Sequence, residues 1–129
     1  MTTIPVGFIH TEDGDDLIVS FAIPTGETWN VRSLTLTRDV KYESLLPSDE
    51  RGVHVSDDEA DPAHGGDYLS MLQELRWEGR RVHLRCTAGR TWELDISDVE
   101  PEEVAEAWRI LRAMNRDKRF RLHLKPSGS

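Results

Sequence analysis

The chain of 129 residues predicts a single α+β domain. The expected core is a curved antiparallel sheet, or a partly closed small barrel, of about six to seven strands. Apolar and polar residues alternate through residues 71–96, a helical apolar pattern follows at about 101–115, and a second alternating stretch comes after it. We therefore expect one helix packed on the apolar face of the sheet, then a final strand. The domain should span residues 1–125, with a flexible tail at 126–129.

The N-terminal half reads as short strands separated by turns. Strands are expected at residues 6–12, 17–23, 28–37 and 53–55. The first two flank Asp13-Gly14, a dipeptide that favours hairpins. In the third strand the apolar side changes partway, so we expect a bulge, or a strand covered on both faces, near Ser33. Residues 40–46 fit either a short helical turn or a loop.

Residues 71–96 read as a three-stranded meander with one apolar and one charged face. The apolar face carries Leu75, Trp77, Val82, Leu84, Cys86, Trp92, Leu94 and Ile96. A two-residue turn at Gly79-Arg80, with Gly first as a type II′ turn requires, pairs apolar with apolar residues. For the next connection we expect the three-residue loop 88–90, which sets Cys86 opposite Trp92. The other face then forms a cross-strand ladder of acids and bases.

The helix has matching start signals and a continuous apolar stripe. Pro101 suits the first helical position, and Glu102 and Glu103 suit the positive end of the helix dipole. The stripe consists of Val104, Ala107, Trp108, Leu111 and Met114. Residues 120–124 then alternate with basic residues, which predicts a closing strand. A basic polar side is also typical of an exposed sheet edge, where it discourages pairing with other chains.

The cysteine content and the absence of long apolar runs indicate a cytoplasmic protein. Cys86 is the single cysteine, so it cannot form an internal disulfide and suits a reducing compartment. No apolar run approaches the ~18 residues of a membrane span, and the N-terminus lacks the features of a signal peptide. We expect no membrane association, and the oligomeric state stays open.

Charge is distributed unevenly along the chain. The net charge is −8; residues 1–67 hold 14 acidic and 4 basic side chains, against 10 and 12 in residues 68–129. Such an acidic chain is a poor nucleic-acid binder, because phosphate contacts need clustered Lys and Arg. One basic cluster near the C-terminus keeps nucleic-acid binding as an alternative: Arg109, Arg112, Arg116, Lys118, Arg119, Arg121 and Lys125.

The sequence contains no motif for nucleophilic catalysis and no Gly-rich phosphate loop, so we expect neither a catalytic residue nor a cofactor. A metal-dependent enzyme remains an alternative, because His54 and His64 could join the acids of residues 57–67 around a divalent cation. These acids lack the twelve-residue ligand pattern of a calcium loop. A small-ligand-binding barrel lined by some of the four Trp residues is a further alternative.

The acidic stretch at residues 56–67 carries the main functional hypothesis. It combines five acids with Pro62, Gly65 and Gly66 and has no apolar periodicity, which predicts a mobile loop. Long loops in small domains are commonly functional or disordered. We expect a small binding protein, such as an inhibitor, an immunity-type protein or an adaptor, that presents this loop to a basic protein partner. The predicted partner-binding residues are Asp57, Asp58, Glu59 and Asp61.

Overall fold

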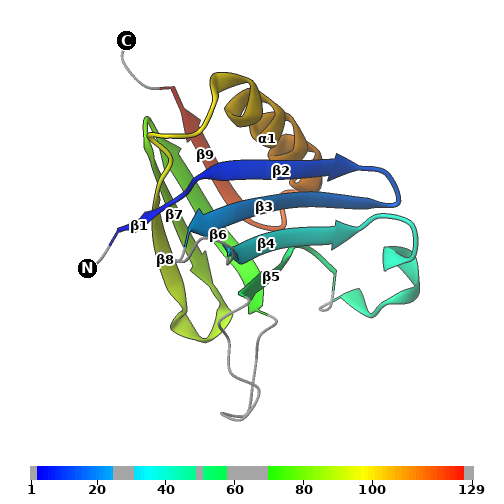
Figure 1. The fold of residues 1–129 in the computed structure, drawn as a ribbon. Coiled ribbons are helices and arrows are strands. Elements are labelled where there is room, and N and C mark those ends of the chain that lie inside the picture. Colours follow the sequence, from blue (N-terminus) through cyan, green and yellow to red (C-terminus); the bar gives the residue numbers. More distant parts are fainter. Residues whose placement is uncertain (1–2, 25–30, 49–50, 58–69, 127–129) are drawn as a thin grey trace.

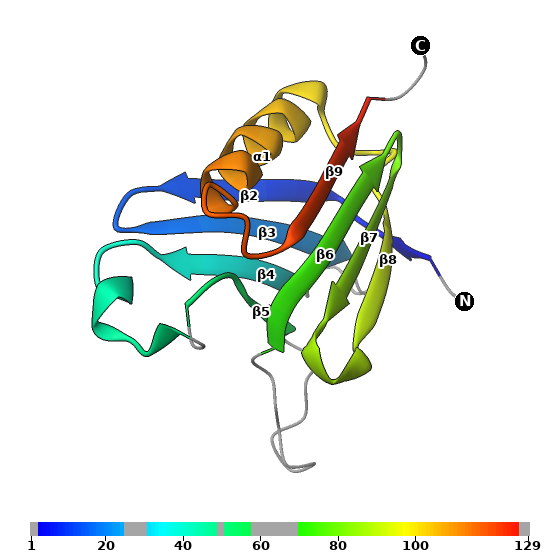
Figure 2. The same ribbon diagram turned by 180° about the vertical axis from the view of Figure 1, so that it is seen from behind.

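The computed structural model describes residues 3–24, 31–48, 51–57 and 70–126. Its elements in chain order are β1 (Ile4–Pro5), β2 (Phe8–Asp13), β3 (Asp16–Pro24), β4 (Val31–Asp39), η1 (Glu43–Leu45), β5 (His54–Asp57), β6 (Ser70–Glu78), β7 (Arg81–Cys86), η4 (Thr87–Gly89), β8 (Thr91–Asp95), α1 (Pro101–Met114) and β9 (Arg121–Lys125). Figures 1 and 2 show β2, β3 and β4 running across the direction of β6 to β9. The predicted curved sheet with one helix and a final strand is confirmed.

Strand β6 joins the two halves of the sheet. One half contains β2 to β5, and the other contains β1, β7, β8 and β9. The strand order is β1-β8-β7-β6-β5-β4-β3-β2, with β9 beside β6. The first residues of β6 pair with β5, whereas residues 74–78 pair with β9. The register between β6 and β7 shifts between Leu72 and Glu74. Because such a bulge bends a strand and increases its twist, it lets β6 belong to both halves.

Helix α1 packs mainly against β2 and β3. Its buried residues are Ala107, Ile110, Leu111 and Met114. Glu103 accepts a hydrogen bond of 2.6 Å from the backbone N–H of Ile9, which covers part of the β2 edge. Trp108 meets Trp77 edge to face at 6.0 Å, and Trp77 lies 6.0 Å from Phe21. These rings therefore link the helix to both halves of the sheet. No helix among the described residues is long and apolar enough to cross a membrane.

The first turn of the meander and the limits of the helix agree with the sequence patterns. Trp77 pairs with Val82, and Gly79 has φ +62°, whereas Arg80 does not have a positive φ. That combination fits the type II′ turn, since a type I′ turn would need positive φ at both central residues. The eight residues expected on the apolar face are all buried. The helix begins at Pro101 and ends at Met114.

Two sequence expectations need correction, and one of two alternatives is excluded. Trp92 lies opposite Leu84 rather than Cys86, because the loop is Thr87–Gly89 and the N–H of Cys86 bonds to the carbonyl of Arg90. Near Ser33 the sequence left two alternatives, a bulge or a strand covered on both faces. The register of β3 against β4 runs without a shift past Ser33, which excludes the bulge from the described part of β4. The sheet is also not wholly antiparallel, since β1 pairs with β8 and β9 with β6 in parallel.

Candidate functional site

Asp57, the first of the predicted partner-binding residues, lies inside the fold. It is the last residue of β5 and is 6% exposed. Its Oδ1 accepts a hydrogen bond of 2.9 Å from Arg32 Nε, and its Oδ2 accepts bonds from Arg32 Nη2 at 2.6 Å and Trp92 Nε1 at 3.1 Å. A two-point Arg–carboxylate contact of this kind fixes orientation as well as charge. Asp57 is therefore buried and held by contacts within the fold.

The other predicted residues, Asp58, Glu59 and Asp61, lie outside the described residues, so their role stays a prediction. The net charge of the described residues can be compared with that of the whole chain. All 16 Lys and Arg residues, but 17 of the 24 acids, lie in the described part of the chain, which therefore carries a net charge of −1 out of −8. The remaining acids are Glu27, Asp49, Glu50, Asp58, Glu59, Asp61 and Asp67. Four of these seven fall between residues 58 and 67.

Arg38 forms a second buried charge centre. It is 2% exposed and lies on the same buried side of β4 as Leu34 and Leu36. Its guanidinium donates two hydrogen bonds of 2.7 and 2.8 Å to Glu43 and two of the same lengths to Asp117. A fifth bond reaches the carbonyl of Met114 at the end of α1. Arg38 thus ties β4 to the end of the helix and to η1, which gives it a structural role.

The carboxylates around Arg38 are held ionised by these contacts. Hydrogen bonding from Arg38 is the main cause that lowers the pKa of Asp117, with burial acting in the opposite direction. At Glu43, burial would raise the pKa, but hydrogen bonds from Arg38 and from the Gly52 N–H outweigh it and leave the pKa lowered. Both groups are therefore ionised at neutral pH, as the ion pairs require.

Two groups bear on catalysis, the potential metal ligands and Cys86. Among them, no group of three or more His, Cys, Asp or Glu side chains could hold a metal ion. His64 and most acids of the predicted metal loop lie outside this part of the chain. Cys86 is 1% exposed, and burial raises its pKa to about 12. Because the thiolate is the reactive form, this thiol is a poor nucleophile at neutral pH.

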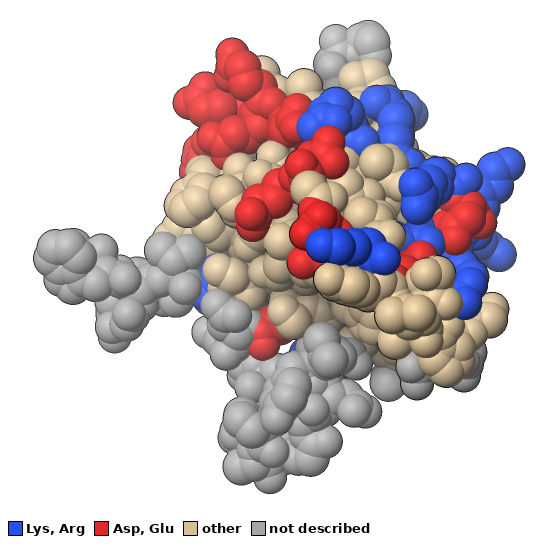
Figure 3. Space-filling model, turned by 90° about the vertical axis from the view of Figure 1, so that its right-hand side faces the viewer, with Lys and Arg blue, Asp and Glu red and all other residues tan. Residues whose placement is uncertain are grey.

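The basic residues near the C-terminus are partly engaged within the fold. Arg109 lies 3.0 Å from Asp13 and also pairs with Glu106. The Arg112 guanidinium lies over the ring of Trp108 at 5.7 Å. Arg119 lies 3.2 Å from Asp117. Figure 3 shows acidic side chains gathered on one side of this face of the molecule and Lys and Arg on the other. Helix α1 itself has acids in its first turn, Glu102 and Glu103, and a base in its last turn, Arg112.

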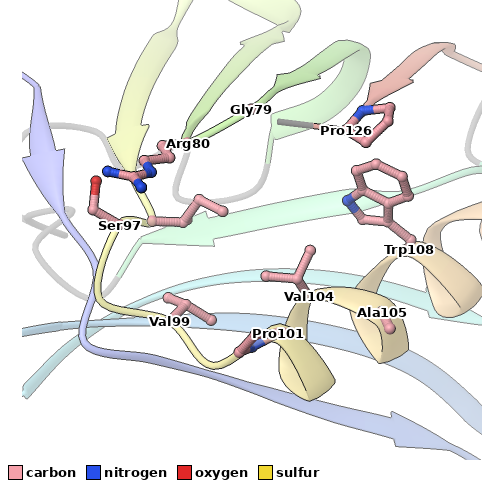
Figure 4. Close-up of a pocket in the computed structure, with 10 residues that line it drawn as sticks. Gly79, Arg80, Ser97, Val99, Pro101, Val104, Ala105, Trp108 and Pro126 are labelled. Carbon is pink, nitrogen blue, oxygen red and sulfur yellow. The ribbon is translucent and has the colours of Figure 1, made fainter. Parts of the chain in front are cut away.

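A cavity of about 410 Å³ lies between the β6–β7 turn, the 96–101 connection and the start of α1. Its lining residues are Gly79, Arg80, Ile96, Ser97, Val99, Pro101, Val104, Ala105, Trp108 and Pro126. Figure 4 shows Arg80 and Ser97 at one side of the cavity and Trp108 with Pro126 at the other. Arg80 is the one charged residue in this lining. No sequence pattern predicted this cavity, because its walls come from segments far apart in the chain.

Comparison of the chain with protein families, with curated proteins and with solved structures finds no match.

Proposed function

We propose that this chain is an interaction protein that binds a basic protein partner through Asp58, Glu59 and Asp61. The observation that supports this proposal is the concentration of negative charge in one stretch of the sequence. Residues 58–67 hold four acids and no Lys or Arg, and all 16 Lys and Arg residues lie elsewhere in the chain. A concentrated negative charge attracts a basic surface, speeds association and disfavours partners of like charge.

The attachment of this acidic segment to the sheet also supports the proposal. It leaves the sheet at Asp57, whose carboxylate is held by Arg32 and Trp92. The chain re-enters the sheet at Ser70, which pairs with Val55 of the neighbouring strand β5. Both ends of the segment are thus fixed to adjacent strands, so its acids are tethered to a rigid scaffold. A tethered group gives up less freedom on binding than a free one.

The proposal is tested with two variants that each remove three negative charges. The first, D58N/E59Q/D61N, alters the proposed binding segment. The matched control, D98N/E100Q/E102Q, alters three exposed acids at the start of α1 and in the connection that precedes it. Tagged parent and variant proteins are incubated with lysate of the native cell at about 50 mM and about 500 mM salt, where electrostatic attraction is respectively strong and screened.

We expect a basic protein to be retained at low salt by the parent and by the control variant. It should be lost from the segment variant and, in all samples, at high salt. Circular dichroism of both variants checks that the fold is intact. Equal loss from both variants would point to a general effect of net charge, and equal retention by both would remove the segment from the interface. Either result would contradict the proposal.

A further inference from the structure

We propose that the cavity beside α1 binds a small, flat, largely apolar molecule that carries one carboxylate. Its volume of about 410 Å³ lies within the range of roughly 300–1,000 Å³ that is usual for small-molecule sites. The walls are mostly apolar, formed by Ile96, Val99, Val104 and two prolines. This inference concerns a different surface from the acidic segment, so neither proposal depends on the other.

The charge of the proposed ligand follows from Arg80. Its guanidinium is the one charged group in the lining, and Arg80 is exposed. Within the described residues Arg80 forms no ion pair, whereas the neighbouring Arg81 lies 3.6 Å from Glu93. Figure 4 shows the Arg80 guanidinium beside Ser97 at one side of the cavity. An unpaired guanidinium at the rim of an apolar cavity suits a carboxylate, which it can bind through two parallel hydrogen bonds.

Among the described residues, the acidic groups near Arg80 do not fill the place that a ligand carboxylate would take beside its guanidinium. Asp95 accepts hydrogen bonds from both the backbone N–H and the hydroxyl of Ser97, which lower its pKa; Arg81 and Arg80 lower it further through their charges. Its carboxylate is therefore engaged by Ser97 and is not part of the cavity lining. Asp98 and Glu100, on the same connection, are exposed and do not line the cavity either.

Trp108 forms the wall of the cavity opposite Arg80, as Figure 4 shows. Its Nε1 is buried and has no hydrogen-bond partner among the described residues. A nitrogen without accessible surface does not border the open space of the cavity, so Trp108 offers a ligand the apolar part of its ring. A flat aromatic ligand can pack against such a ring.

Naphthalene probes test the preference for a carboxylate. 2-Naphthoate carries the carboxylate, and 2-naphthylmethanol has the same rings but no charge. Each is titrated into the ¹⁵N-labelled protein while the indole N–H resonances are followed by NMR. The W108F variant identifies the Trp108 resonance by its disappearance. Trp92 serves as an internal control, because its Nε1–H already donates to Asp57.

We expect the Trp108 resonance to move with added 2-naphthoate, because its ring lines the cavity, while that of Trp92 stays in place. The naphthoate should bind at least about tenfold more tightly than the alcohol, a ratio that corresponds to ~1.4 kcal/mol. This preference should disappear in R80M and persist in R81M, which removes the neighbouring arginine outside the cavity. Absence of saturable binding at millimolar probe, equal affinity for acid and alcohol, or an equal effect of R80M and R81M would each overturn the proposal.

Discussion

Replacing Arg38 by methionine should destabilise the protein by about 3 kcal/mol. Methionine keeps much of the apolar length of the side chain but removes all five hydrogen bonds of the guanidinium. Removing one partner of a buried ion pair costs ~3–5 kcal/mol, because the other charge is left buried and unpaired. The Glu43 side chain is 13% exposed and would bear most of this penalty, whereas Asp117 is 39% exposed and water would replace part of its lost contact. We therefore expect the lower end of the range.

Urea denaturation monitored by tryptophan fluorescence measures this change. The midpoint should fall while the dependence of the unfolding free energy on urea stays constant. Arg109→Met is a matched control, since Arg109 also contacts two carboxylates, Glu106 and Asp13, but is 54% exposed. Its midpoint should stay close to that of the parent, because exposed ion pairs contribute little. Equal effects of the two substitutions would refute the argument that burial decides the importance of Arg38.

The same substitution should change the response of stability to acid. The pKa values of Asp117 and Glu43 are lowered in the folded protein. Such carboxylates stabilise the fold at a pH above their unfolded pKa of about 4, and this contribution is lost as the pH falls. The parent should therefore lose stability below about pH 5, and R38M should lose less over the same interval. Parallel stability curves for the two proteins would show that these contacts do not govern acid unfolding.

Two further predictions concern the buried polar groups of the sheet. Asp57→Asn should lower the free energy of unfolding by about 2–3 kcal/mol, because the bonds from Arg32 and Trp92 lose their charged acceptor; an unchanged urea midpoint would contradict the anchoring role. Cys86 should react with a disulfide reagent at pH 8 only after denaturation, since it is buried and its pKa is raised to about 12. Rapid reaction of the native protein would contradict the burial and the raised pKa of the Cys86 thiol.

Local patterns predicted the helix and most of the strands, but they did not predict the short strand β1 or every pairing. The Gly79-Arg80 turn has two residues, so its length determines which residues lie opposite each other. The next loop allowed two registers that differ by two residues, and both keep Cys86 and Trp92 on the apolar face. Alternation cannot distinguish them. Local patterns also cannot predict the parallel pairing of β9 with β6, because the two strands are distant in sequence.

The alternation of strand residues in the sequence could have predicted the two buried charged residues, Arg38 and Asp57. Arg38 continues the inward positions of Leu34 and Leu36, and Asp57 continues that of Val55. A charged residue at the next inward position of a strand predicts a buried ion pair, because alternation points it toward the core. The composition of residues 56–67 instead favoured a solvated role for Asp57. The cavity beside α1 gave no comparable signal, since only the tertiary fold brings Arg80 and Trp108 to one space.

The pairing of β9 with β6 has a consequence for synthesis of the protein on the ribosome. Residues 74–78 of β6 lie within the sheet, yet their parallel partner follows every other element in the chain. Until β9 has emerged, this part of β6 offers unpaired backbone groups to any other nascent chain. The meander can form early because its contacts are local, whereas closure of the β6 edge must await a contact across more than forty residues. A chain interrupted before Arg121 would therefore keep an open, association-prone edge in the middle of an otherwise finished sheet.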